Sequence, residues 1–170
     1  MRPFLKLVRD GYKLLVSGAS LLQSPFLLAL RFYIFSQLFI SGQGKFSNIA
    51  KVSDYFASLG VPLPTLNAYL AGATETFGSL LLIIGLASRL SAIPVAFTML
   101  IAYLTADLEA VTKIFSDPDK FVKDDAFPYF AGALIILIFG PGRLSIDGLI
   151  KWRLGKSPDT NGLTDGSLKA

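Results

Sequence analysis

Two charged side chains stand inside stretches of the sequence that are otherwise apolar. Arg31 falls in the block from about Pro25 to Phe46, and Glu75 in the block from about Leu66 to Leu86. A lone charge at bilayer depth costs about 2.5–3.5 kcal/mol on insertion scales, so such residues pair or serve a function. At 1.5 Å per residue, Arg31 lies about 10 Å and Glu75 about 16 Å from the same membrane edge. Long side chains bridge such a gap, so we predict an Arg31–Glu75 pair in the protein interior.

The predicted pair has two interpretations. In the first, the pair is structural and fixes how the first two helices pack. In the second, it lines a polar cavity that binds a ligand or relays protons, which is the default for an ionisable residue at membrane depth. The sequence leaves both interpretations open, because neither a histidine nor a third acidic residue stands at that depth.

A second group of charged residues is expected at the outer mouth of the helices. Lys45 ends the first apolar block, and acidic residues follow the third block and precede the fourth: Asp107, Glu109, Asp124 and Asp125. Carboxylates this dense can bind a hard cation through their oxygens. However, no calcium-loop spacing is present, so the favoured interpretation is a solvated acidic loop, and no metal is predicted.

The chain contains no cysteine and no histidine. This excludes disulfides, thiol redox chemistry, c-type haem attachment and ordinary zinc sites, and it removes the commonest haem ligand and general base. The charged fraction is 16% and the hydrophobic fraction 52%, whereas about 25% of residues are charged in a typical soluble domain. The basic residues flank apolar blocks instead of forming a stripe with aromatic platforms, which favours a membrane protein and argues against nucleic-acid binding.

The apolar residues fall into four blocks that predict membrane spans. The blocks run from about residue 25 to 46, 66 to 86, 90 to 108 and 126 to 139. About 20 apolar residues cross a bilayer, so the fourth block is short. It either gains length from Phe121, Val122 and the stretch after Leu144, or forms an interfacial or re-entrant segment. The predicted fold is all-α: a transmembrane four-helix bundle with an N-terminal interfacial amphipathic helix.

The sequence divides into three regions. Residues 1–24 form the amphipathic N-terminal segment, with a cleaved signal peptide as the less favoured alternative. Residues 25–154 form the membrane domain, and residues 155–170 a polar tail that is expected to be disordered.

The end of the membrane domain carries its own local signals. Gly140-Pro141-Gly142 is a helix stop, and Ser145 or Asp147 is expected to cap a short helix from Gly148 to Leu154. Trp152 is predicted to be an interfacial anchor. A cytoplasmic anion or partner site around Arg143 is the functional alternative to this local explanation.

Lysine and arginine counts in short loops predict the orientation. The side that holds both termini carries ten of these residues: Arg2, Lys6, Arg9, Lys13, Arg89, Arg143, Lys151, Arg153, Lys156 and Lys169. The other side carries five: Lys45, Lys51, Lys113, Lys120 and Lys123. We therefore predict that both termini are cytoplasmic.

Several motifs, taken in order, resemble the DoxX family of small bacterial membrane proteins. Arg31 is followed by Gly42-Gln43-Gly44-Lys45-Phe46, by Gly60-Val61-Pro62-Leu63-Pro64, by the run from Glu75 to Arg89 and by the run from Gly140 to Asp147. The resemblance covers about Phe26 to Lys151. On this resemblance the family's helix-one arginine, its lysine, its helix-two glutamate and its terminal aspartate are Arg31, Lys45, Glu75 and Asp147.

The resemblance implies a four-helix protein of the bacterial cytoplasmic (inner) membrane. The family is linked to the DoxD subunit of a thiosulfate:quinone oxidoreductase, so the resemblance implies other membrane redox subunits as partners and a contact with quinone, while no cofactor of the chain's own is predicted. Many relatives carry a histidine near the outer end of helix three. Here that stretch reads Ala106-Asp107-Leu108-Glu109, which puts a histidine-dependent metal, haem or proton-transfer role in doubt.

Three functions follow from these observations. The leading one is an accessory subunit of a quinone-linked redox system, which provides a polar intramembrane site without a redox centre of its own; a non-catalytic subunit is favoured, and the sequence leaves open whether the chain is itself an enzyme. The second is a binding or transport module for a small ligand or lipid held by Arg31 and Glu75. The third is a structural assembly factor. Membrane lipid is an expected partner in each case, and the oligomeric state does not follow from the sequence.

Overall fold

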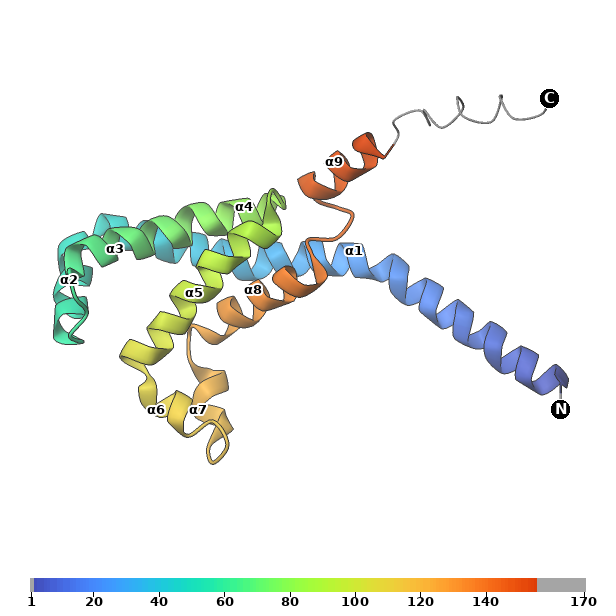
Figure 1. Ribbon diagram of the computed structural model, residues 1–170, viewed down its shortest axis with the longest axis horizontal. Helices are drawn as coiled ribbons and strands as arrows, with labels where there is room; N and C mark the ends of the chain where they lie inside the picture. Colours follow the sequence, from blue (N-terminus) through green and yellow to red (C-terminus); the bar gives the residue numbers. More distant parts are fainter. Residues whose placement is uncertain (1, 156–170) are drawn as a thin grey trace, which may run out of the picture.

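The computed structural model describes residues 2–155, with side chains described from residue 9 onward. Every element in this range is a helix, so the predicted all-α class is confirmed (Figure 1). The elements are α1 (Arg2–Ser47), α2 (Ile49–Ser58), α3 (Pro64–Ala73), the π-helix η1 (Thr74–Gly78), α4 (Ser79–Ile84), α5 (Ser88–Ala106), α6 (Leu108–Thr112), α7 (Pro118–Lys123), α8 (Phe127–Phe139) and α9 (Ile146–Leu154).

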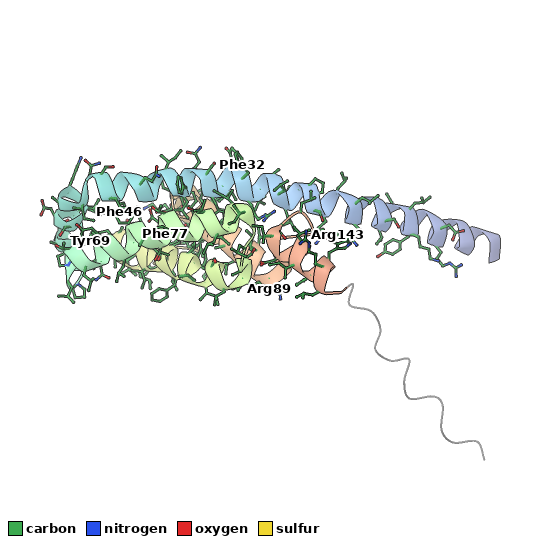
Figure 2. All side chains as sticks on the ribbon, turned by 90° about the horizontal axis from the view of Figure 1, so that it is seen from above. Phe32, Phe46, Tyr69, Phe77, Arg89 and Arg143 are labelled. Carbon is green, nitrogen blue, oxygen red and sulfur yellow. The ribbon has the colours of Figure 1, made fainter. Side chains whose placement is uncertain are left out.

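The first helix is longer than the sequence predicts. α1 runs for 46 residues with Pro25 inside it, so the predicted helix start at Pro25 is wrong. A proline removes one backbone hydrogen bond and strains the turn before it. The helix-favouring leucines on both sides of Pro25 carry α1 through this position. As a result the first half of α1 extends past the other helices, at the end of the molecule that also holds Arg89 and Arg143 (Figure 2).

The second predicted span is a helix with one wide turn. α3, η1 and α4 follow one another without a gap from Pro64 to Ile84. The π turn η1 contains Glu75. The Ser79 hydroxyl lies within hydrogen-bond reach of two backbone carbonyls of this turn, those of Glu75 and Thr76. Ser79 therefore supplies a local partner for the carbonyls of a turn whose backbone pattern is irregular.

α5 and α8 complete the packed core. Their bounds agree with the third and fourth predicted blocks to within two residues. Phe121 and Val122 do not lengthen α8, because they belong to α7. α5 packs along α8 and against η1 and α4, while α1 packs on α3, η1, α4 and α8. The buried cluster consists of Phe35, Leu38, Leu82, Ala92, Val95, Ala96, Met99, Ala133 and Ile136.

The outer surface of these helices is strongly apolar. Phe32, Phe77 and Phe97 are 64%, 62% and 61% exposed. Two helical stretches, Arg9–Ser47 and Ser88–Ala106, are long and apolar enough to cross a membrane by length and composition. Polar side chains are buried in the interior: Arg31, Glu75, Thr76, Ser79, Ser88 and Ser91. This distribution suits a protein whose exterior contacts lipid.

Short helices lie at both ends of the packed core. α2, α6 and α7 stand where loops were expected. α9 agrees with the predicted short helix, and its N-cap is Ser145, whose hydroxyl accepts a hydrogen bond from Gly148 N at 3.0 Å. Ser145 rather than Asp147 is therefore the cap. Apart from Gly155, the predicted polar tail 155–170 lies outside the described residues.

Candidate functional site

Glu75 is buried, but its partner is Lys45. The Lys45 Nζ atom lies 2.6 Å from Glu75 Oε2, and the Ser41 hydroxyl donates to the same oxygen at 3.1 Å. Lys45 also donates to the Ser41 hydroxyl at 3.2 Å. The Glu75 side chain is 5% exposed and the Lys45 side chain 24%. The predicted Arg31–Glu75 pair is therefore wrong, although both residues are buried.

The register of the helices explains this correction. Arg31 lies beside Gly85, at the end of α4, and at 1.5 Å per residue Gly85 is about 15 Å along the helix from Glu75. The predicted pair requires the first helix to begin beside Pro25, so that Arg31 and Glu75 lie at similar depths. Because α1 begins far earlier, the level of Arg31 is not fixed by Pro25, and the gap to Glu75 is too wide for an ion pair.

Two glycines lie at the interface between α1 and the helix that carries Glu75. Gly42 packs against Thr76 and the Cβ of Glu75, and Gly72 packs against Phe46 and Lys45. A Cβ at position 42 would lie 2.7 Å from Thr76 N, so a side chain there would separate the helices, whereas a Cβ at position 72 would make ordinary contacts of 3.4–3.5 Å. The close approach is what lets Lys45 meet Glu75 across the interface.

Arg31 has a different environment. Its side chain is 0% exposed. The Nη2 atom donates to the carbonyl of Leu144, and Nε donates to the carbonyl of Leu27 at 3.3 Å. Within the described part of the chain, Nη1 has no hydrogen-bond partner. Arg31 thus joins α1 to the segment that precedes α9, and this contact is between parts of the chain more than a hundred residues apart.

Asp147 holds the first turn of α9 against the α4–α5 turn. Its carboxylate oxygens accept hydrogen bonds from Ala87 N, Ser88 N and the Ser88 hydroxyl, each at 2.8 Å, and its own N–H donates to the carbonyl of Gly85 at 2.9 Å. Burial alone would raise the pKa of Asp147, but the bonds from Ser88 and Ala87 and the charge of Lys151 bring this pKa below its ordinary value. The carboxylate is therefore held in its charged form.

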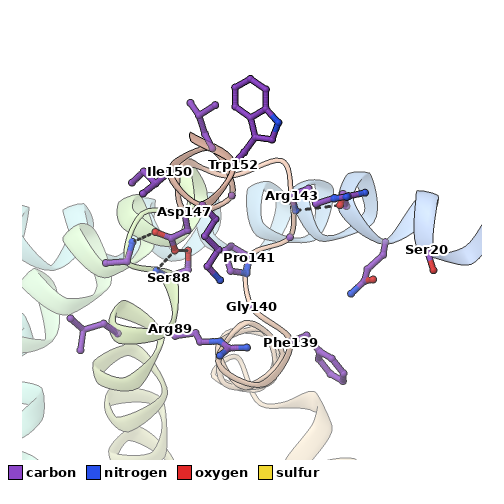
Figure 3. A pocket seen from close by; sticks show the side chains of 18 residues that line it. Ser20, Ser88, Arg89, Phe139, Gly140, Pro141, Arg143, Asp147, Ile150 and Trp152 are labelled. Atoms are coloured by element: carbon purple, nitrogen blue, oxygen red, sulfur yellow. Dashed lines mark hydrogen bonds between the residues drawn. The ribbon is translucent and has the colours of Figure 1, made fainter. Parts of the chain in front are cut away.

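A groove of about 1090 Å³ lies beside this contact, between α1, the start of α5, the loop from Gly140 to Arg143, and α9 (Figure 3). We call it the α9 groove. The cations Arg89, Arg143 and Lys151 line it, together with apolar side chains such as Phe139. Residues from two of the DoxX-like motifs, the runs that end at Arg89 and at Asp147, also line it: Arg89, Gly140, Pro141, Gly142 and Asp147.

A smaller hollow of about 320 Å³ lies at the other end, lined by Asp107, Glu109, Ala110, Lys120, Lys123 and Asp124. Glu109 accepts hydrogen bonds from Lys113 at 2.6 Å and from Lys120 at 3.0 Å. These bonds lower the pKa of Glu109 to about 2. Burial raises the pKa of Asp124, and the neighbouring Asp107 adds to this shift. The hydrogen bond from Ala126 N acts in the opposite direction and lowers the pKa.

The structure divides the residues that were grouped at the outer mouth. Asp107 and Glu109 line the smaller hollow, whereas Asp125 is exposed beside it and Lys45 binds Glu75 instead. Lysines neutralise much of the acidic charge there through the Glu109 and Asp119 ion pairs. Among the described residues, no group of three or more histidine, cysteine, aspartate or glutamate side chains is placed to hold a metal ion.

Comparison with known families and proteins finds a similarity to the DoxX family. Residues 26–108 match the family model described as DoxX. This match covers 83 of the 170 residues, just under half of the chain. A protein of Bacillus subtilis (strain 168) named "Putative oxidoreductase CatD" is 35% identical over 72 residues, which cover 42% of this chain and 52% of the relative. The match thus spans about half the length of this curated relative. No solved structure matches the chain.

The DoxX match and the two long apolar helices indicate a membrane protein. Arg31, Lys45 and Glu75 fall within the matched DoxX segment, whereas Asp147 and α9 lie beyond it.

Sequence reasoning missed Ser41 and Ser88 as partners of the buried acids. Ser41 stands four residues before Lys45, and the helical period places both on one face, so this spacing could have revealed it. Ser88 is different: it meets Asp147 only through the fold, because 59 positions separate the two residues.

Proposed function

We propose that this DoxX protein is an integral accessory subunit of a quinone-linked membrane oxidoreductase, and that Lys45, Glu75 and Ser41 form its polar intramembrane site. The observation that carries the proposal is the buried Lys45–Glu75 ion pair on a π turn. Charges inside a membrane protein are costly and usually functional, and π turns are frequent at functional sites. The name of the Bacillus relative supports an oxidoreductase as the class of partner.

The proposed membrane arrangement has four spans, with both termini on the cytoplasmic side. The spans are α1, the continuous α3–η1–α4 helix, α5 and α8. The 19 residues of α5 extend about 28 Å and the 13 residues of α8 about 20 Å. Since the hydrocarbon core is about 30 Å thick, α8 needs flanking residues or local thinning of the bilayer to span it. The basic end with Arg89 and Arg143 is the cytoplasmic one.

The two hollows described above lie away from the Lys45–Glu75 pair. Neither the α9 groove nor the smaller hollow includes Lys45 or Glu75, and Gly42 packs against Thr76 beside them. The chain also lacks the thiol and imidazole groups that commonly hold metal redox centres. We therefore assign quinone and electron transfer to the partner protein.

The polar site can act on a partner through its exposed edge. The Lys45 side chain is 24% exposed while Glu75 is almost closed off. A partner helix that covers this edge would meet an ammonium group whose counter-ion is already in place, so docking does not leave an unpaired charge in lipid. The Ser41 hydroxyl links both charges and completes a short chain of groups that can exchange protons.

The test uses the full chain in its native host. Tagged wild-type protein is purified in mild detergent and examined for a co-purifying oxidoreductase, and quinone-dependent respiration is compared with that of a deletion strain. The double variant K45M/E75M removes both charges together, which a structural pair tolerates. We expect this variant to remain helical and monodisperse but to lose the partner and to reproduce the respiration of the deletion strain.

The matched control is E109Q/K113M, which removes an exposed pair with the same 2.6 Å separation. The control should keep both partner and respiration. Full respiration of the K45M/E75M strain would show that the pair only fixes helix packing. Solute movement by the purified chain in vesicles, without a partner, would instead identify a transport module.

A further inference from the structure

We propose that the α9 groove binds the headgroup of an anionic phospholipid, with the phosphate at Arg143 and Lys151. This inference goes beyond the proposed oxidoreductase role and rests only on the membrane location of the chain. It concerns a site far from the Lys45–Glu75 pair, so the two proposals can fail separately.

The charge of the groove favours an anion. Arg89, Arg143 and Lys151 line it, against the single carboxylate of Asp147. That carboxylate is already bound by Ala87 and Ser88. Among the described residues, none of the three cations takes part in a salt bridge. Arg89 donates one hydrogen bond to the carbonyl of Ile138 at 3.1 Å, which leaves other N–H groups of its guanidinium for a ligand.

The three cations come from separate parts of the chain. Arg89 begins α5, Arg143 follows the Gly140-Pro141-Gly142 turn, and Lys151 lies on α9. The fold holds these parts together through the Asp147 hydrogen bonds and through a bond from Arg143 N to the Ser24 hydroxyl at 3.3 Å (Figure 3). Convergence of cations from distant segments on one hollow indicates a formed site rather than a run of basic residues in sequence.

The apolar part of the lining distinguishes a lipid from a free anion. Leu90 and Phe139 line the groove and are 71% and 65% exposed, and Ile150 on α9 is 43% exposed. These side chains offer contact for acyl chains beside the cations, whereas a small inorganic anion would use none of them. A basic pocket between membrane helices with an apolar wall is the form that sites for anionic headgroups take. The ligand chemistry is therefore a phosphodiester with attached acyl chains.

The only tryptophan of the chain provides the readout. Trp152 lines the groove, and the sequence contains no other tryptophan. The full-length protein is placed in phosphatidylcholine nanodiscs that contain rising fractions of brominated phosphatidylglycerol, or of brominated phosphatidylcholine as the zwitterionic comparison. Bromine quenches tryptophan fluorescence on contact. We expect phosphatidylglycerol to quench Trp152 at a much lower mole fraction than phosphatidylcholine does.

The decisive variants are K151Q and the double variant R143Q/K151Q, with R153Q as the control. Arg153 is also on α9 but does not line the groove. Each removed groove cation should weaken the preference for phosphatidylglycerol about fivefold, so the double variant should lose about 25-fold, while R153Q stays close to wild type. Because Arg143 also packs beside α1, the double variant can fail to fold. In that case the lipid preference of K151Q alone tests the proposal.

Three outcomes would overturn the proposal. The first is equal quenching by the two lipids. The second is an equal loss in R153Q and K151Q, which would indicate general surface charge. The third is full competition by millimolar inorganic phosphate, which would indicate a site for a free anion.

Discussion

Gly42 of α1 packs directly on Thr76 of the π turn. A Cβ atom at position 42 would lie 2.5 Å from Thr76 Oγ1, 2.7 Å from Thr76 N and 3.0 Å from the Cβ of Glu75. Both the backbone nitrogen and the helix that carries it resist displacement, so only glycine fits without moving a helix. The buried ion pair depends on this contact, because Lys45 lies one turn further along α1.

The first prediction concerns this contact. Gly42→Ala should destabilise the protein by about 1–3 kcal/mol, the usual cost of an extra group in a packed interior. Gly44→Ala is the control, since nothing lies within 4 Å of a Cβ there and alanine gains up to about 1 kcal/mol over glycine in a helix. The free energy of unfolding in detergent micelles measures both. Equal effects of the two substitutions would contradict the close-packing argument.

The second prediction concerns the charges of the ion pair. Lys45→Met leaves the buried Glu75 carboxylate without its cation, and we expect a cost of about 3 kcal/mol. Glu75→Gln should cost less, because the Lys45 side chain is 24% exposed and can turn toward a more polar surrounding.

The K45M/E75M double variant should be less destabilised than the sum of the two single variants. The exposed pair of Glu109 and Lys113 provides the comparison, with an expected coupling below about 1 kcal/mol. Strict additivity at positions 45 and 75 would show that the two charges do not interact.

The third prediction concerns the contact between Arg31 and Gly85. Gly85 has φ +73°, and a Cβ there would meet Arg31 Nη1 and also Ser145 Cβ at 2.5 Å. Gly60 has φ +74° but nothing within 4 Å, so Gly60→Ala carries the same backbone strain without the contact. We expect Gly85→Ala to cost about 1–3 kcal/mol more than Gly60→Ala. Thermal unfolding of both variants in one detergent compares them, and equal melting temperatures would rule out the contact.

The fourth prediction is a pH dependence that comes from Asp147. The pKa of this carboxyl is lowered in the folded protein, so its contribution to stability is complete above the unfolded pKa of about 3.9. The contribution is lost as the pH falls through the lower folded value. Asp147→Asn should therefore reduce stability near pH 6 and have a smaller effect below pH 3. Melting temperatures of both proteins across this range test the sign, and a difference that grows toward acid pH would contradict it.

The fifth prediction tests the membrane orientation, and the absence of native cysteines makes the experiment direct. Ser116 lies between α6 and α7, Arg153 lies on α9, and both are exposed. An impermeant maleimide should label Ser116→Cys in intact cells and Arg153→Cys only after the membrane is opened. Labelling in the reverse order would place the termini outside.

The sequence determined the helical class, the positions of the main helices and the identity of the buried charges. These follow from local information: the apolar blocks predict where α5 and α8 lie, Gly140 ends α8, and an arginine or glutamate within such a block must be buried or functional. The sequence also narrowed the cap of α9 to Ser145 or Asp147, and the structure shows that it is Ser145. The DoxX resemblance came from the order of these same motifs.

Only the tertiary structure decided which charges meet. The position of Arg31 relative to Glu75 depends on how α1 is aligned along the continuous α3–η1–α4 helix. Because α1 continues through Pro25, no residue in the sequence indicates this alignment. Contact between Gly42 and Thr76 sets the register, and the Asp147 bonds to Ala87 and Ser88 set the place of α9. Such contacts join residues that are distant in the chain, so no local pattern encodes them.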